Sequence, residues 1–171
     1  VNGDSGLLIE YCDMDIYSGI SNGTIIGSVN GDADIKLENI SAKLQGAGNI
    51  ITGIGTIAGN SCMVRLENVN ISSNIRAKEC YGIGCRAGRT DIYIGYAAVK
   101  SVVQGKAAVA FGNSVMSAKL YCSNADIGTN AVTEFNSDIG ALEKNIQLEN
   151  GRAEFILNGQ EIKRQILAAR L

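Results

Sequence analysis

Apolar residues recur along most of the chain with a period of 28 or 29 positions. The clearest marker is a glycine directly after an apolar residue, and it returns at intervals of 28, 29, 28 and 28 residues, as Gly27, Gly55, Gly84, Gly112 and Gly140. Between these glycines, apolar residues alternate with polar ones, skip one extra position, and alternate again. A period of two is typical of strands with one buried face, so each copy predicts strand, bend and strand. Copies repeated at this period predict a solenoid over residues 1–141.

Four columns of apolar or thiol residues emerge when the copies are aligned on their glycines. We expect all four to point into the core: Leu7, Ile35, Val64, Ile92 and Leu120; Ile9, Leu37, Leu66, Ile94 and Cys122; Cys12, Ile40, Val69, Ala97 and Ala125; Met14, Ala42, Ile71, Val99 and Ile127. Residues 7–16 match only the second half of a copy, so the chain enters the array part-way through a coil.

The extra position in each copy predicts a sharp bend. It is occupied by Asn39, Asn68, Tyr96 and Asn124, and asparagine tolerates the left-handed backbone conformation that such a bend requires. We therefore expect a stacked asparagine ladder. The single interval of 29 residues predicts one inserted residue within residues 58–61, at a corner where it leaves the columns undisturbed.

Residues 142–171 are expected to form a C-terminal cap. The register fails after the fifth glycine, because Leu148 follows it by eight positions where the other copies have ten or eleven. Asn-Gly pairs at residues 150–151 and 158–159 predict a type I′ hairpin and a second turn. Residues 160–171 carry spaced apolar residues that predict a weak amphipathic helix. Such a cap would cover an otherwise unpaired strand edge.

Composition favours one domain with a β-rich core. Apolar residues make up 46% of the 171 residues but Phe, Trp and Tyr only 5%, so aliphatic side chains must fill the interior. The chain has 21 glycines and no proline. Because proline lacks the N–H donor that a paired strand needs, its absence suits continuous strand pairing.

Charge argues against two classes of partner. The formal net charge is −2 and the isoelectric point is near 5.2, which gives no basic field for nucleic acid or an anionic membrane. No apolar run approaches the length of about 18 residues that predicts membrane insertion, and no signal peptide pattern is present. Because the chain does not begin with Met, we expect it to be a fragment of a longer protein.

The five cysteines predict neither a disulfide scaffold nor a metal site, because their number is odd and they are scattered. Cys80 and Cys85 could in principle approach one metal ion, but the chain has no histidine and no second cysteine pair to complete a zinc site. Cys12 and Cys122 fall on apolar columns, where a thiol acts as a small hydrophobe. We therefore expect no metal and no other cofactor.

The repeat resembles one coil of a right-handed parallel β-helix, the pectate-lyase-like architecture. Gly-Ile-Gly at residues 53–55 and 82–84, with Leu-Glu-Asn at residues 37–39 and 66–68, is similar to glycine-rich repeats of bacterial surface proteins. The resemblance covers residues 7–141. It implies an all-β solenoid of about five coils with about 28 residues in each coil, closed by the hairpin and short helix of the cap. Known members include pectin-degrading enzymes, phage tailspikes, adhesins and polysaccharide-binding modules.

The residues give little support for a catalytic function. The resemblance implies aspartates clustered near a histidine for a hydrolase, or an Arg or Lys base beside calcium-binding carboxylates for a lyase. The chain has no histidine and no Asp-Asp pair. Asp13 and Asp15, like Asp32 and Asp34, are same-face neighbours at corners, where solvated carboxylates are ordinary. Calcium takes about six oxygens, and these pairs lie on different coils and corners, so we predict no metal ligand. Without a histidine or a carboxylate cluster, we also predict no catalytic residue.

The best candidate for a binding site is an outward column formed by Lys36, Arg65, Tyr93 and Tyr121. Adjacent strands lie about 4.8 Å apart, so this column predicts two cations followed by two stacked rings. Sugar rings stack on tyrosine and sugar carboxylates pair with arginine, which makes a polysaccharide or host glycan the expected partner. The alternative is ordinary cross-strand pairing, which stabilises a sheet without any ligand.

These observations predict a non-catalytic segment of a bacterial surface or secreted protein, extracellular or at the cell surface. It would act as adhesin, spacer or glycan-binding module. A polysaccharide-active lyase or hydrolase of the β-helix type is the alternative. Ice binding is disfavoured because Thr24 and Thr52 are followed in their column by Tyr81 and Val109, so no threonine ladder forms.

Overall fold

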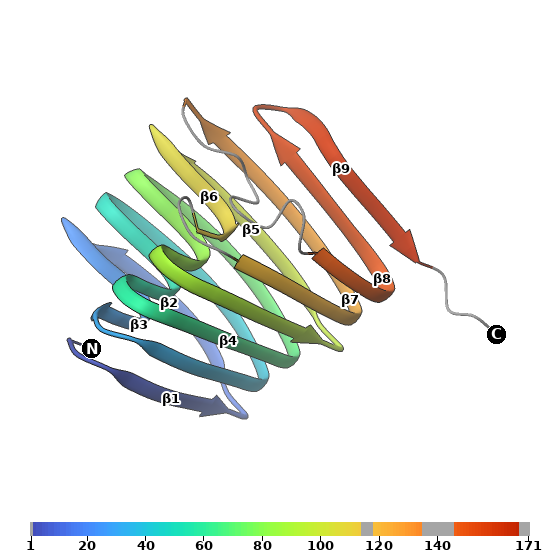
Figure 1. Ribbon diagram of the computed structural model, residues 1–171, viewed down its shortest axis with the longest axis horizontal. Helices are drawn as coiled ribbons and strands as arrows, with labels where there is room; N and C mark the ends of the chain where they lie inside the picture. Colours follow the sequence, from blue (N-terminus) through green and yellow to red (C-terminus); the bar gives the residue numbers. More distant parts are fainter. Residues whose placement is uncertain (1, 114–117, 135–145, 168–171) are drawn as a thin grey trace.

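The protein is a parallel β-solenoid of about five turns (Figure 1). The computed structural model describes residues 2–113, 118–134 and 146–167, and this part of the chain contains strands and no helix. The fifth glycine of the repeat, Gly140, lies outside the described residues. Strands β1 and β9 lie at opposite ends of the stack, with the successive coils side by side between them.

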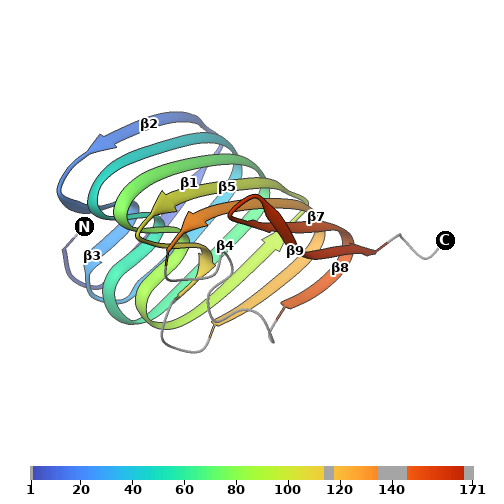
Figure 2. The same cartoon turned by 90° about the horizontal axis from the view of Figure 1, so that it is seen from above.

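The strands follow one another with short bends and loops. They are β1 (Ser5–Glu10), β2 (Asp13–Gly19), β3 (Asn22–Asn30), β4 (Ala33–Gly95), β5 (Ala98–Gly105), β6 (Ala107–Gly112), β7 (Ala118–Thr133), β8 (Ile146–Leu157) and β9 (Gln160–Leu167). Strand β4 has 63 residues because pairing continues through its bends, so it winds through more than two coils (Figure 2).

Consecutive coils pair with each other in parallel, and only the last pairing among the described strands, that of β8 with β9, is antiparallel. Strand β1 pairs with β4 at a separation of 28 residues, as in Leu7 with Ile35, and β5 pairs with β7 at the same separation. Strand β7 pairs with β8 in parallel at a separation of 26, as in Leu120 with Ile146. Two residues are therefore lost between Thr133 and Ile146, which explains why the sequence register fails there.

The predicted columns form the core. Leu37, Leu66 and Ile94 are 0%, 1% and 3% exposed, and the outward residues between them are far more accessible. In the first coil, Leu7, Ile9, Cys12 and Met14 are only partly buried, because β1 and β2 have a neighbouring coil on one side alone. The sequence prediction of inward and outward positions is therefore confirmed.

The glycine column is required by close contact between coils. Gly55 and Gly84 have φ values of +141° and +136°, a region that side chains rarely adopt. A Cβ atom added to Gly55 would also lie 1.7 Å from the carbonyl oxygen of Gly84, and one added to Gly84 would lie 2.1 Å from that of Gly112. Any other residue in this column would force adjacent coils apart.

Three buried polar side chains support the same corner, and sequence reasoning did not find them. Each donates a hydrogen bond to the carbonyl oxygen of a glycine 25 residues earlier: Ser28 to Gly3 (2.7 Å), Thr56 to Gly31 (2.9 Å) and Asn113 to Gly88 (2.8 Å). A buried carbonyl without a partner costs about 1–3 kcal/mol, so this polar column stabilises the solenoid from inside.

The inserted residue of the 29-residue coil lies where the sequence predicts it. Asp32 accepts hydrogen bonds from the backbone N–H groups of both Asn60 (2.6 Å) and Ser61 (3.0 Å). In the preceding coil, Asp4 accepts a hydrogen bond from the N–H group of Asp32 (2.9 Å). The aspartate carboxylate thus holds the longer corner in place, which leaves the neighbouring columns in register.

Two predictions for the C-terminal part are wrong. Residues 150–151 form no hairpin, because β8 runs through them in parallel with β7 and Gly151 pairs with Ala125. Asn150 instead takes the bend position, with φ of 51°. The second Asn-Gly pair does join antiparallel strands, β8 and β9, and residues 160–167 pair with β8 as a strand where a helix was expected. Residues 142–145 and 168–171 lie outside the described residues.

The bend column adopts the left-handed conformation throughout. Its φ values lie between 46° and 54°, and its members are Tyr11, Asn39, Asn68, Tyr96, Asn124 and Asn150. Asn68 donates a hydrogen bond to the side-chain oxygen of Asn39 (2.6 Å), and Asn150 donates one to that of Asn124 (3.3 Å). The predicted ladder exists in two parts, because Tyr96 interrupts it.

Replacing Tyr96 by Asn is expected to stabilise the protein. Tyrosine is strained in the left-handed region, and its ring is 65% exposed, so little packing would be lost. An asparagine there can also bond to Asn68 and Asn124. We expect the free energy of unfolding to rise by about 1 kcal/mol and Tm by about 2–4 °C. Thermal unfolding followed by circular dichroism measures both, and a fall in Tm would show that the ring stabilises the native bend.

All five cysteines are free thiols, and four of them are buried. Burial raises the pKa of Cys80 and of Cys85 to about 11, and that of Cys122 to about 12. Burial also raises the pKa of Cys62. These side chains therefore stay in the neutral thiol form at physiological pH, which agrees with a core role and leaves them poor nucleophiles and metal ligands.

Alkylation should therefore distinguish the cysteines. At pH 8 the native protein is expected to react with iodoacetamide first at Cys12, which is partly exposed, and much more slowly at Cys80, Cys85 and Cys122, because their thiolate forms are rare. Peptide mapping by mass spectrometry gives the rates, with denatured protein as the control in which all sites react alike. Native Cys80 labelled as fast as Cys12 would contradict its burial.

Candidate functional site

A groove of about 660 Å³ runs over the outward column that the sequence singled out. Its lining includes Lys36, Arg65, Tyr93 and Tyr121, so the structure brings all four predicted residues together on one face. Lys36, Arg65 and Tyr93 come from successive coils of β4, and Tyr121 comes from β7, where it pairs with Tyr93. The strand spacing of about 4.8 Å then places the four side chains in a row.

The two tyrosine rings stack on each other. Their centroids are 4.9 Å apart and their planes differ by 7°. Each ring therefore uses one of its faces in the pair. The other face of Tyr93 is directed toward the coil of Arg65, and the other face of Tyr121 toward the coil of Gln147. The hydroxyl groups of the two tyrosines, which both line the groove, would suit a ligand rich in hydroxyls.

Both cations of the row form ion pairs within the sheet. The ammonium group of Lys36 lies 2.5 Å from a carboxylate oxygen of Glu38, and this hydrogen bond raises the pKa of Lys36 above its ordinary value. The guanidinium group of Arg65 lies 2.6 Å from a carboxylate oxygen of Asp34. Each cation keeps further N–H donors, but a neighbouring carboxylate already offsets its positive charge.

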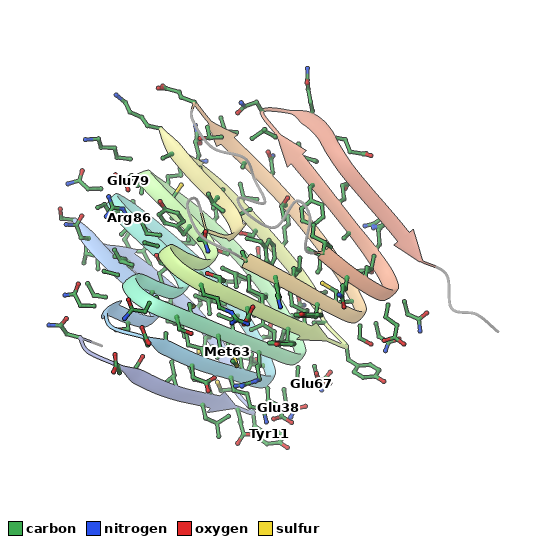
Figure 3. All side chains as sticks on the ribbon, in the orientation of Figure 1. Tyr11, Glu38, Met63, Glu67, Glu79 and Arg86 are labelled. Carbon is green, nitrogen blue, oxygen red and sulfur yellow. The ribbon has the colours of Figure 1, made fainter. Side chains whose placement is uncertain are left out.

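The floor of the groove is formed by small residues in the neighbouring outward column. Gly95 and Ser123 pair with each other and lie beside the two tyrosines. Glu67 precedes them in this column and Glu149 follows, so a carboxylate stands at each end of the floor. A Cβ atom added to Gly95 would lie 2.2 Å from a carboxylate oxygen of Glu67, which shows that this side chain leans over the floor. Figure 3 shows Glu67 next to Glu38 at the outer side of these coils.

Glu149 and Gln147 are lining residues that the 28-residue register did not place on this face. The shortened coil before β8 displaces them from the 28-residue register. A signal was nevertheless present, because residues 148–150 repeat the Leu-Glu-Asn triplet of residues 37–39 and 66–68. Alignment on this triplet places Glu149 in the same column as Glu38 and Glu67.

The aspartate pairs considered for catalysis or calcium are not brought together as a site. Asp32 accepts the backbone hydrogen bonds of the long corner, and Asp34 is held by Arg65. Among the described residues, no group of three or more His, Cys, Asp or Glu side chains is placed to hold a metal ion. In the same part of the chain, no helix has the length and apolar character needed to cross a membrane.

The column considered for ice binding lies inside the solenoid. Thr52, Tyr81 and Val109 are 0%, 2% and 1% exposed, so these members of the column offer no surface to a ligand. The row of Lys36, Arg65, Tyr93 and Tyr121 lines the groove of about 660 Å³, whereas Asp32 and Asp34 line a separate hollow of about 370 Å³.

Comparison of the chain with protein-family models, with curated proteins and with solved structures gives no significant match. The architecture, a parallel β-solenoid of about five turns, is what the structure establishes.

Proposed function

We propose that the chain is a non-catalytic, glycan-binding segment of a bacterial surface or secreted protein. The observation that carries the proposal is the groove beside Tyr93 and Tyr121, which combines a small-residue floor with an aromatic wall. Pockets for small ligands are concave and mostly apolar, with a few polar groups placed at their rims. The tyrosine hydroxyls and the Ser123 hydroxyl supply such groups here.

The rigidity of the surface supports this proposal. Every wall and floor residue of the groove lies on a strand that is paired with its neighbours, so the site needs little ordering when a ligand binds. Consecutive coils also repeat the surface at a spacing of about 4.8 Å. A long saccharide chain could therefore lie along the stack and contact several coils.

The resemblance to pectate-lyase-like β-helices and to glycine-rich surface repeats supports the same proposal and a location outside the cell. The spacer function is the second candidate, because the stacked tyrosines and the two ion pairs already stabilise the sheet without a ligand. The enzyme alternative has weaker support. The chain has no histidine, and Asp32 and Asp34 are engaged by the corner backbone and by Arg65.

Replacing both Tyr93 and Tyr121 by Ala is expected to abolish glycan binding while the fold persists. Both side chains lie on the outer face of the sheet, so Tm should fall by no more than about 5 °C. Isothermal titration of wild type and variant against hexasaccharides of glucose, N-acetylglucosamine, glucosamine and galacturonic acid measures the effect.

Two other exposed tyrosines give a matched control. Tyr11 and Tyr17 are 78% and 71% exposed and do not line the groove, so their double replacement by Ala should leave binding unchanged. If wild type binds none of the saccharides, or if the Tyr93 and Tyr121 variant binds as well as wild type, the proposal is wrong and the spacer function stands. Release of new reducing ends from any hexasaccharide would favour the enzyme alternative.

A further inference from the structure

Some charged side chains of the groove form ion pairs and others do not. Its lining contains two cations, Lys36 and Arg65, and three carboxylates, those of Glu38, Glu67 and Glu149. Lys36 is bound by Glu38, and Arg65 is bound by Asp34, which lies beyond the lining. Glu67 and Glu149 hold no hydrogen bond or ion pair with any residue that the structure describes. The charge available to a ligand is therefore negative.

The two unpaired carboxylates also have a defined position. They stand at opposite ends of the floor formed by Gly95 and Ser123, and the stacked rings flank this floor on one side. The carboxylate of Glu67 leans over Gly95, so it is directed at the space where a ligand on the floor would lie. Three strand spacings of about 4.8 Å separate the backbone positions of Glu67 and Glu149, about 14 Å, and the Glu67 carboxylate shortens this span by leaning toward Glu149.

We infer that the groove selects amino sugars, with the protonated amine held by Glu67 or Glu149. This inference rests on the proposed glycan-binding function and specifies the class of glycan. Hydroxyl groups of the sugar can bond to the tyrosine hydroxyls and Ser123, and an ammonium group forms charge-assisted hydrogen bonds with a carboxylate. An acidic sugar would instead meet two unpaired carboxylates, and the two cations nearby are already offset by Glu38 and Asp34.

Titration with three hexasaccharides of equal length tests the inference. Oligomers of glucosamine, of N-acetylglucosamine and of galacturonic acid differ in charge, and we expect wild type to bind the glucosamine oligomer at least tenfold more tightly than the other two. Added salt should weaken that preference, because it screens exposed charges. Raising the pH through the pKa of the sugar amine should weaken it as well, since acetylation and deprotonation both remove the positive charge.

Glu67→Gln and Glu149→Gln are the decisive variants. We expect one or both to weaken binding of the glucosamine oligomer by about three- to tenfold, as for loss of a partly exposed charge-assisted hydrogen bond. Binding of the N-acetylglucosamine oligomer should stay within about twofold, because no charge is lost there. Glu10→Gln is the matched control, since Glu10 is an exposed carboxylate in the same column but outside the groove lining.

The outcomes separate this inference from the proposed function. Equal binding of the glucosamine and N-acetylglucosamine oligomers, or an unchanged affinity in both glutamine variants, would overturn the choice of amino sugars and leave glycan binding intact. Tighter binding of the galacturonic acid oligomer would overturn it as well. Failure of every saccharide to bind wild type would overturn the proposed function, and the inference with it.

Discussion

Parallel backbone hydrogen bonding between consecutive coils is the constraint on which the rest of the structure depends. Because strand residues pair with those 28 positions further along in most coils, their side chains form columns that run along the stack. A column can contain only residue types whose side chains can pack against similar side chains about 4.8 Å away in the adjacent coils. Aliphatic side chains meet this condition inside, and glycine meets it at the corner where coils come into contact.

The same constraint explains which irregularities the fold accepts. An inserted residue is tolerated at the corner of Asn60 and Ser61 because Asp32 bonds to both N–H groups, so the strands on either side keep their register. The coil before β8 is two residues shorter, and the parallel pairing of β7 with β8 resumes after it. Insertions and deletions therefore occur in the bends and loops between strands, and a substituted side chain remains in the same column.

The sequence was sufficient for the columns and for the bends, because both are repeated patterns of residue type. Leu37, Leu66 and Asn68 occupy the positions that periodicity predicts. The sequence was insufficient where a local signal competed with the register. Asn150 and Gly151 carry a strong hairpin signature, yet parallel pairing with β7 prevails. Ion pairs such as that of Arg65 with Asp34 could not be predicted either, because a long outward side chain has several charged residues within reach.

The groove arises because two neighbouring columns depart from their pattern in the same two coils. Where the first column changes from cations to Tyr93 and Tyr121, the second changes from glutamate to Gly95 and Ser123. Either change alone would leave no site, since glutamates would fill the floor or cations would replace the wall. Interrupting a row of like charges stabilises a sheet, but any neutral residue would serve that purpose. Glycine within a strand costs about 0.5–1 kcal/mol relative to alanine. A Cβ atom at position 95 would lie 2.2 Å from a carboxylate oxygen of Glu67, so Gly95 leaves room for the Glu67 side chain to lie over the floor.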